Sequence, residues 1–320
     1  MRNVFFLYAT LFFIASCKIQ PDSNRDNDKF NPNKTYKLQL NPASASSYYY
    51  DITSESESEL ELDDKKTSNE NKTTVGVNYS INKDSAGNML MTMVYDKVHL
   101  YTKNGDTETE ADAANAAVSI NPVERMLGIF RGTKIVSTIS PSGELLNISG
   151  YKEMGEKMLA AFAPDDINGK AIAQSQWEKL IAKGMVKNNI EQLFKIFPDS
   201  AVHIGDTWRL SSKQEGEIPI IVKSTYTLKT INDDIAIIEA KGDISTDNNA
   251  TSMLIPGGTA TELGGEQQAE FEMETKTGML ISCRIKTNIE GSIQAMGRKI
   301  PLTIKTSLKV KGRRLTEGSH

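Results

Sequence analysis

The chain has 320 residues, a formal net charge of −4 and a sequence pI of about 5.6. This slightly acidic balance argues against a nucleic-acid partner, because proteins that bind nucleic acid carry a clear excess of Lys and Arg. With only two cysteines, Cys17 and Cys283, the chain also falls outside the class of small secreted domains held by several disulfides.

The first residues have the layout of a secretion signal. A positively charged start is followed by an apolar run over 4–14, which is shorter than the about 20 residues that a membrane-spanning helix needs. The run ends in a segment that resembles the lipobox of bacterial lipoproteins: Ile14, Ala15, Ser16 and Cys17. We predict a signal peptide over 1–16, read by the signal peptidase through Ile14, Ala15 and Ser16, and acylation of Cys17. The alternative is an ordinary signal peptide followed by an incidental cysteine.

An acylated Cys17 would carry two or three acyl chains, enough for stable membrane anchoring. It would also leave Cys283 unpaired, as a buried and inert thiol. Residues 17–32 are polar and are predicted to form a flexible tether. Lipoproteins destined for the outer surface typically carry an acidic cluster after the cysteine, and the segment after Cys17 does not resemble them, which implies the periplasmic side of the envelope. The membrane, reached through the lipid anchor, is therefore one predicted partner.

Alternating apolar residues predict strands in the first part of the mature chain. Tyr36, Leu38 and Leu40 indicate an early strand, and residues 75–81 and 89–95 indicate a hairpin around the turn at 84–88. The intervening stretch 55–73 is rich in Glu, Ser, Asn and Lys. It is predicted to be a solvated loop, with a cation-binding segment as the alternative.

Helical periodicity replaces alternation in the middle of the chain. Asn121 and Pro122 predict a helix start, with Glu124 as a capping-box residue. After a strand over 133–139 and a turn, apolar residues at helical spacing predict three helices: one from Tyr151, one over 172–181 and one around 190–194.

Alternation returns from residue 220 to residue 310, with apolar residues on one face of each strand and charged residues on the other. We therefore predict an α+β fold: a large antiparallel β-sheet, as two halves or an open barrel, with the central helical segment packed on its apolar face. The predicted domain spans 33–315, with possible halves 33–120 and 200–315 around a helical insert at 121–198.

Three motifs, in this order after a lipobox, carry a resemblance to a known family. They are Thr133–Val136 followed by Ser140–Leu145, the stretch Phe197–Trp208 with its Gly-Asp-Thr-Trp turn, and Thr275–Leu280. Together they resemble the uncharacterised Bacteroidota lipoproteins that share the domain of unknown function 6263. The resemblance spans most of the mature chain and implies no particular activity.

Known catalytic and cofactor motifs are not found in the sequence. Its three histidines are not at metal-ligand spacing, and no phosphate loop, nucleophile elbow or His-Glu-x-x-His occurs. We therefore expect no cofactor and no enzymatic activity, although a hydrolase built on carboxylates alone stays a third hypothesis.

The first hypothesis is a non-catalytic module that binds a lipid or another hydrophobic ligand between sheet and helices, as periplasmic lipid carriers of this plan do. The predicted pocket lining is Met91, Met93, Tyr95, Met158, Phe162 and Trp208. The second hypothesis is an envelope scaffold that binds another protein or a glycan. A closed core made of the same apolar residues is the alternative to a pocket.

Overall fold

The computed structural model describes residues 34–62, 65–162, 187–214, 219–247, 259–295 and 298–316. The predicted signal peptide, the lipobox with Cys17, the tether and the predicted helix over 172–181 therefore lie outside the described residues. The described strands are β1 (Ser46–Leu62), β2 (Lys65–Lys83), β3 (Met89–Asn104), β4 (Thr107–Asp112), β5 (Lys134–Ile139), β6 (Leu145–Ser149), β7 (Thr207–Gln214), β8 (Ile220–Asn232), β9 (Ile235–Thr246), β10 (Thr259–Glu274), β11 (Leu280–Ala295) and β12 (Arg298–Leu315). The helices are α1 (Pro122–Phe130), α2 (Tyr151–Phe162), α4 (Lys187–Phe194) and the short 3-10 helix η1 (Ala113–Asn115).

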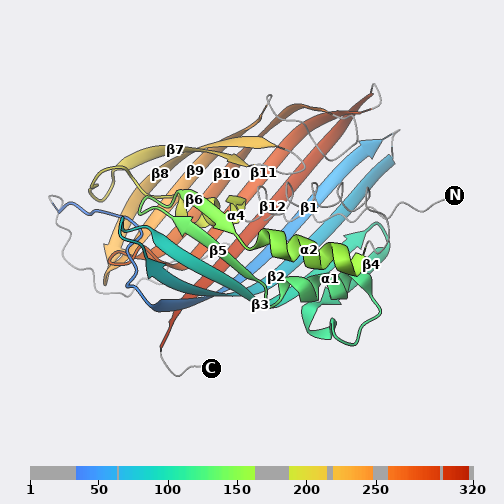
Figure 1. Cartoon of the computed structure of the whole chain (residues 1–320). Coiled ribbons are helices and arrows are strands. Elements are labelled where there is room, and N and C mark those ends of the chain that lie inside the picture. The colour runs from blue at the N-terminus through green and yellow to red at the C-terminus, as the bar shows by residue number, and fades with distance from the viewer. Residues whose placement is uncertain are drawn as a thin grey trace.

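The strands form one continuous 12-stranded sheet. Its order is β6-β5-β3-β2-β1-β12-β11-β10-β9-β8-β7, with β4 paired to β3, and the strand pairs are antiparallel. Strands β6 and β7 are its edges, so the sheet is open. It curls around the helices, which lie in front of it together with β5 and β6 (Figure 1). This confirms the predicted antiparallel sheet with helices on one face, while the predicted domain boundaries stay a prediction.

The prediction of a solvated loop over 55–73 is wrong. Its described residues, 55–62 and 65–73, belong to the long strands β1 and β2, which pair with each other. Serines of β1 such as Ser54 and Ser56 are buried, and the glutamates between them face the other side of the sheet. There Glu57 lies opposite Lys305 of β12, and Glu55 forms a 3.0 Å ion pair with Lys72. An alternation of small and charged residues can therefore form a strand when the charged side chains pair with opposite charges on neighbouring strands.

The predicted early strand is also wrong in its detail. Tyr36 forms only an isolated bridge with Val202, so residues 34–45 are an extended segment outside the sheet. Leu38 and Leu40 are nevertheless buried in the core, as their alternation suggested.

Helices α1 and α2 begin where the sequence predicts. The Asn121 side chain caps α1 by accepting a hydrogen bond from the Val123 amide, with proline at the first helical turn. Glu124 does not complete a capping box, because its carboxylate accepts from Asn115 at 2.8 Å and from the Asp112 amide instead. Helix α4 places Ile190, Leu193 and Phe194 in the core.

Candidate functional site

The face of the sheet that carries the helices, here called the inner face, holds a small apolar cluster between β3, β4, η1 and α1 and two larger ones. The helix-packed cluster combines residues of the sheet with Met154 of α2, the apolar side of α4 and the 34–45 segment. The strand-only cluster has nine buried members, and every one lies on β8 to β12: Ile220, Val222, Ile244, Leu263, Ile289, Ile293, Ile300, Leu302 and Ile304. Leu60 of β1 packs against it.

A row of hydroxyl and amide side chains separates the two clusters. Starting on β8 and following direct strand partners, this polar row runs through Ser224, Gly242, Gln267, Thr287, Thr306 and Ser56. Directly opposed residues of antiparallel strands point to the same face, so these side chains all belong to the inner face. On β8 to β12 the neighbouring rows are apolar, apart from Gly265, with Val222, Ile289 and Ile304 on one side and Tyr226, Ile285 and Leu308 on the other.

Most of the polar row is buried. Ser224, Thr287, Thr306 and Ser56 each expose at most 7% of their surface, and Gln267 is half-buried. The Gln267 amide Nε2 donates to the Thr287 Oγ1 at 3.2 Å. Buried polar groups lower the stability of a sheet unless they are hydrogen-bonded, so a row of them across an apolar face calls for an explanation.

A narrow crevice opens onto this row beside α4. Its walls are the polar side of α4, strand β7 and the inner face of β8, β10 and β11, and its floor includes Ser224, Gln267, Tyr226 and Phe271. The enclosed volume is about 30 Å³, room for about two water molecules. The crevice is therefore a slot between solvent and the polar row, and it is too narrow for a large ligand unless α4 shifts.

Charges at the rim of the crevice are balanced. Glu191 lies on α4 and Lys195 directly follows its end, and Lys213 of β7 forms a 3.1 Å ion pair with the buried Asp247. Inside, burial raises the pKa of Tyr226 to about 12. The ring of Tyr226 stacks on Trp208 at 5.7 Å between centroids.

The predicted pocket residues do not gather at one cavity. Met91 and Met93 of β3 are fully buried in the helix-packed cluster, and Tyr95, whose pKa burial raises to about 12, packs edge-on against Phe130. Trp208 lies at the other end of the sheet, where its indole Nε1 donates to the Ile196 carbonyl at 3.0 Å. It packs behind Tyr226 and does not line the crevice itself.

Two further predicted lining residues belong to α2. Met158 and Phe162 lie in its second half, where the structure describes the backbone of the helix but not these side chains. Their part in a pocket therefore stays a prediction. Cys283, by contrast, is confirmed as a buried thiol, and its burial raises its pKa far above the usual range.

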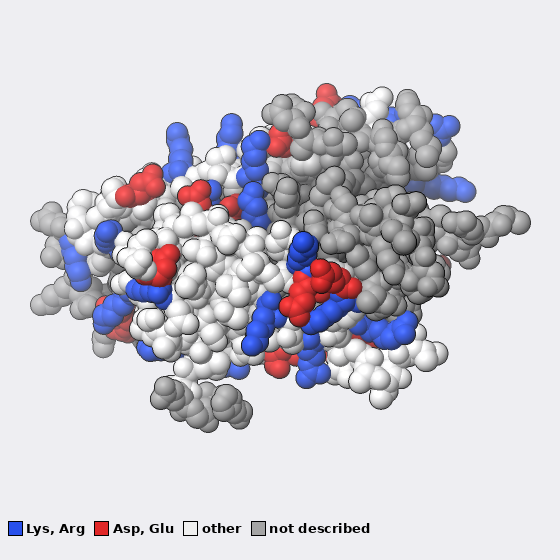
Figure 2. All heavy atoms as spheres, viewed as in Figure 1, with Lys and Arg blue, Asp and Glu red and all other residues white. Residues whose placement is uncertain are grey.

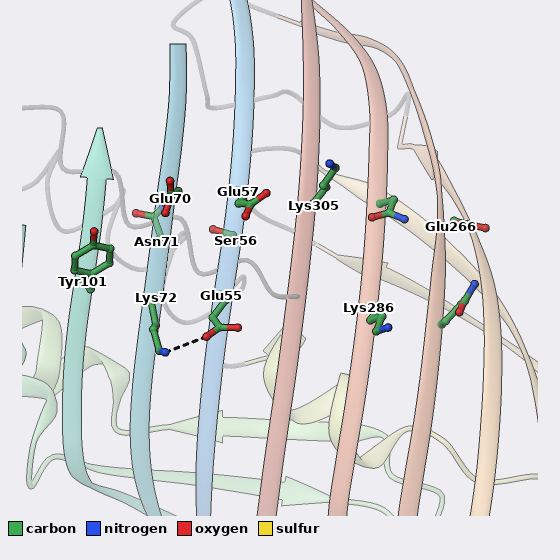
Figure 3. Close-up of a pocket in the computed structure, with 12 residues that line it drawn as sticks. Glu55, Ser56, Glu57, Glu70, Asn71, Lys72, Tyr101, Glu266, Lys286 and Lys305 are labelled. Atoms are coloured by element: carbon green, nitrogen blue, oxygen red, sulfur yellow. Dashed lines mark ion pairs between the residues drawn. The ribbon is translucent and has the colours of Figure 1, made fainter. Parts of the chain in front are cut away.

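The outer face of the sheet has a wider hollow, here called the outer basin, of about 620 Å³. Figure 3 shows its side chains on β3, β2, β1, β12, β11 and β10. They include four glutamates (Glu55, Glu57, Glu70 and Glu266), three lysines (Lys72, Lys286 and Lys305) and Tyr101. The near balance of charge offers little attraction for a polyanion. The charges instead complement one another between strands.

Other chemistry is sparse in the described part of the chain. No group of three metal-ligating side chains occurs among the described residues, and none of their helices is long and apolar enough to cross a membrane. His99 and His203 each contact one exposed carboxylate, Glu110 at 2.8 Å and Asp206 at 3.1 Å. Figure 2 shows Lys, Arg, Asp and Glu side chains in small groups around a largely uncharged area on the helix-bearing side.

The polar row was missed by the sequence reasoning. On β8, β10, β11 and β12 it is a single Ser, Thr or Gln inside an apolar stripe, which looks like an ordinary interruption of the pattern, and on β9 the position is Gly242. Only the register of six strands brings these interruptions into line. The first signal in the register is the pairing of β10 with β11, which places Gln267 opposite Thr287.

Comparisons with known proteins place the chain only by family and by fold. No curated protein matches its sequence. Among solved structures, it is similar to the lipovitellin of a study of "lipid-protein interactions in lipovitellin", with a TM-score of 0.51 at 9% identity. That similarity covers 87% of this chain and 26% of the lipovitellin chain, and it concerns the fold alone. The model of a family of unknown function (DUF6263) matches residues 86–280, more than half of the chain, and the protein therefore belongs to this family.

Proposed function

We propose that the protein is a non-catalytic binding module, anchored in the bacterial cell envelope by lipid on Cys17, that holds a hydrophobic ligand on the inner face of its sheet. The observation that carries the proposal is the strand-only cluster. Nine aliphatic side chains gather there without any contribution from the described helices, beside a polar row and a crevice. Because these side chains are buried, acyl chains would reach them from the crevice as α4 moves aside.

The similarity to lipovitellin supports this proposal at the level of the fold. A long antiparallel sheet that curls without closing has a concave face. The space on that face depends on which segments pack against it. Lipovitellin itself is a protein with lipid-protein interactions. A small exported domain with the same curl has the right surface to hold a lipid of its own.

The predicted anchor fits this function. A lipid-binding module that faces the periplasm benefits from being held near the membrane that supplies its ligand. The tether of about 15 residues would keep the domain within on the order of 20 Å of the bilayer.

Native mass spectrometry tests the proposal on the full chain, ejected from detergent micelles, with solvent extraction of any bound molecule. The expected result is a stoichiometric apolar adduct. Ile289→Gln, inside the strand-only cluster, should reduce its occupancy about tenfold, because it places an amide among aliphatic side chains. The matched control Asn288→Gln, next in sequence but on the outer face, should leave the occupancy unchanged. A chain without adduct, or equal loss in both variants, would overturn the proposal.

The outer basin favours a second candidate, an envelope scaffold that binds a glycan or another protein. Its volume suits a few sugar rings, and Tyr101, Asn288 and Gln268 offer an aromatic ring and amides among the charges. Glycan-array binding that is lost in Tyr101→Ala but kept in Ile289→Gln would favour this function over the first.

A further inference from the structure

We propose that the loop between β4 and α1, residues 113–121, inserts its aliphatic side chains into the surface of a lipid bilayer. This role of the apolar loop lies beyond ligand binding on the inner face, because it sets which side of the molecule faces the membrane. Figure 1 shows this part of the chain at the lower right, where it projects beyond α1, and Figure 2 shows an uncharged area at the same place.

The tip of the apolar loop exposes aliphatic side chains almost completely. Val118 exposes 89% of its surface and Ile120 exposes 97%, and the neighbouring Ala117 is exposed as well. Leu90 and Leu146, the other exposed large apolar side chains in the described part of the chain, expose only 37% and 51%. Single exposed aliphatic residues are common on soluble proteins, but two of them within three residues form a continuous apolar tip.

The polar side chains of the loop, in contrast, are bonded at its base. The Glu124 carboxylate of α1 accepts a 2.8 Å hydrogen bond from the Asn115 side chain and another from the Ser119 hydroxyl, and these bonds hold the pKa of Glu124 below its usual range. The Asp112 carboxylate accepts from the Ala114 amide at 2.7 Å. The loop is therefore inverted relative to an ordinary surface loop, because its polar side chains bond internally while its apolar side chains face outward.

Backbone amides near the tip are also bonded within the loop. The amides of Val118 and Ser119 donate to the Asn115 carbonyl at 3.1 and 3.0 Å. The Asn121 amide donates to the Ser119 hydroxyl at 3.0 Å. A backbone that enters an apolar medium loses free energy when its N–H groups leave water without another partner. Since these amides already have partners, the tip can leave water at a smaller cost.

The loop has a packed base. Ala113, its first residue, is buried with Val98, Ala111 and Leu127 in the small cluster between β3, β4, η1 and α1. The conformation that presents the tip is thus held by the fold before any contact with lipid. Insertion therefore does not have to order the loop first, which removes one cost of association.

Two features favour a bilayer over a protein as the partner of this tip. No charged residue occurs from Ala113 to Val123, and the hydrogen-bonding groups near the tip are used internally. Protein interfaces carry a hydrogen bond for about every 100–200 Å², whereas acyl chains require neither charges nor hydrogen bonds. The predicted tether over 17–32 would reach about 55 Å when fully extended and would leave the orientation of the domain free. An inserted tip would fix that orientation.

A fluorescent probe on the loop tests the insertion in the full chain, added to vesicles of phosphatidylethanolamine and phosphatidylglycerol. Ala117→Cys places a nitrobenzoxadiazole label at the tip, and Ser85→Cys places the same label on the exposed turn between β2 and β3. Cys283 is buried, and any labelling of the native cysteines is common to both variants. A lipid with a spin label in its acyl chain should quench the loop probe at least about threefold more than the turn probe, because interfacial segments enter the bilayer by about 5–10 Å.

Further variants connect the quenching to the two aliphatic side chains. In the Ala117→Cys chain, Val118→Ser combined with Ile120→Ser should reduce the quenching to that of the turn probe, because insertion no longer buries either side chain. Both residues are exposed, so these substitutions should leave the fold intact. The matched control Leu146→Ser removes an exposed leucine from β6 and should leave the quenching unchanged.

Equal quenching of the loop and turn probes, or quenching that survives the double variant, overturns the insertion, and so does a chain that stays free of the vesicles. A loop probe that stays in water with lipid vesicles, yet becomes shielded when envelope membranes with their proteins are added, assigns the tip to a protein partner and also overturns it. None of these outcomes bears on the inner face, whose ligand is measured by native mass spectrometry, so the two proposals can fail separately.

Discussion

The two ends of the inner face use the same strands for different purposes. At one end, side chains of α4, α2 and the 34–45 segment fill the curve of the sheet, and aromatic residues such as Tyr50, Tyr79 and Phe194 meet edge to face. At the other end, the cluster consists of aliphatic strand residues alone. The polar row marks the boundary between them.

This difference shows that one open sheet can carry two kinds of apolar packing. The helix-packed end supplies a dense core with large side chains, which is where most of the burial free energy lies. The strand-only end buries Ile, Leu and Val of β8 to β12, with no described helix among its members. Four predictions test this comparison, from the largest expected effect to the smallest.

Strand β9 offers the same residue type at both ends. Ile238→Ala, at the helix-packed end, should destabilise the protein by about 4 kcal/mol, because dense surroundings do not collapse into the cavity. Ile244→Ala, at the strand-only end, should cost only about 2 kcal/mol. Urea unfolding followed by circular dichroism measures both values. Equal losses would show that the two ends are equally well packed.

Two glycines with nearly the same backbone angle test how tightly the helix-packed end is built. Gly87 has φ +83° with open space around it, while a Cβ at Gly143, with φ +84°, would clash with the Phe194 carbonyl oxygen. Gly87→Ala should cost about 1–2 kcal/mol from backbone strain alone. Gly143→Ala should cost about 1–3 kcal/mol more, because the end of α4 must move. Thermal melts of both variants give the difference, and equal melting temperatures would mean that α4 yields easily.

The outer face should tolerate change much better than the inner face. Asp51 of β1 lies opposite Lys311 and forms a 3.3 Å ion pair with Arg313. Asp51→Lys should lower stability by about 0.2–1 kcal/mol at low salt, and the effect should shrink as salt screens it. Adding Lys311→Glu should restore most of the loss. A loss as large as that of Ile244→Ala would mean that charge pairing, and not burial, holds β1 to β12.

The smallest effect is expected at the turn between β2 and β3. Side-chain and backbone hydrogen bonds from Asn88 hold the pKa of the Asp84 carboxyl below its usual range, helped by the Ala86 amide at 2.8 Å. Its folded pKa is lower than its unfolded pKa, so its stabilisation is present above about pH 4 and is lost as the pH falls further. The difference in unfolding midpoint between the native chain and Asp84→Ala should therefore shrink from about pH 5 to about pH 3. A constant difference would show that the turn does not depend on the charge.

Most strands and helices could be predicted because each carries its own local pattern. The hairpins around 84–88, 232–234 and 276–278 have turn residues between alternating runs, and α1 has both a cap and a proline. The prediction for the stretch 55–73 failed because the inward residues of its strands are small and polar. Its strand character comes from neighbours on β12 that are about 240 residues away in the chain.

The site was harder to predict because it depends on register. Met91 and Met93 suited a pocket by composition, yet the fold places them beneath helices in a filled core. Gln267 and Thr287 carry no signal on their own strands. They form a row only when strand pairing aligns them with Ser224 and Thr306. Local sequence does not specify which strands become neighbours across a 12-stranded sheet.

The pairing of β1 with β12 has a consequence for how the chain folds. Tyr50 pairs with Gly312, so the central ladder of the sheet joins the first described strand to the last. During synthesis, β1 and β2 emerge long before β12, and the open edge of β1 stays unpaired until nearly the whole chain is present. Such non-local pairing slows folding, and until it forms, the unpaired backbone edge of β1 can pair with other strands. The glutamates and serines of β1 keep this unpaired edge polar, which disfavours its pairing with the edges of other nascent chains.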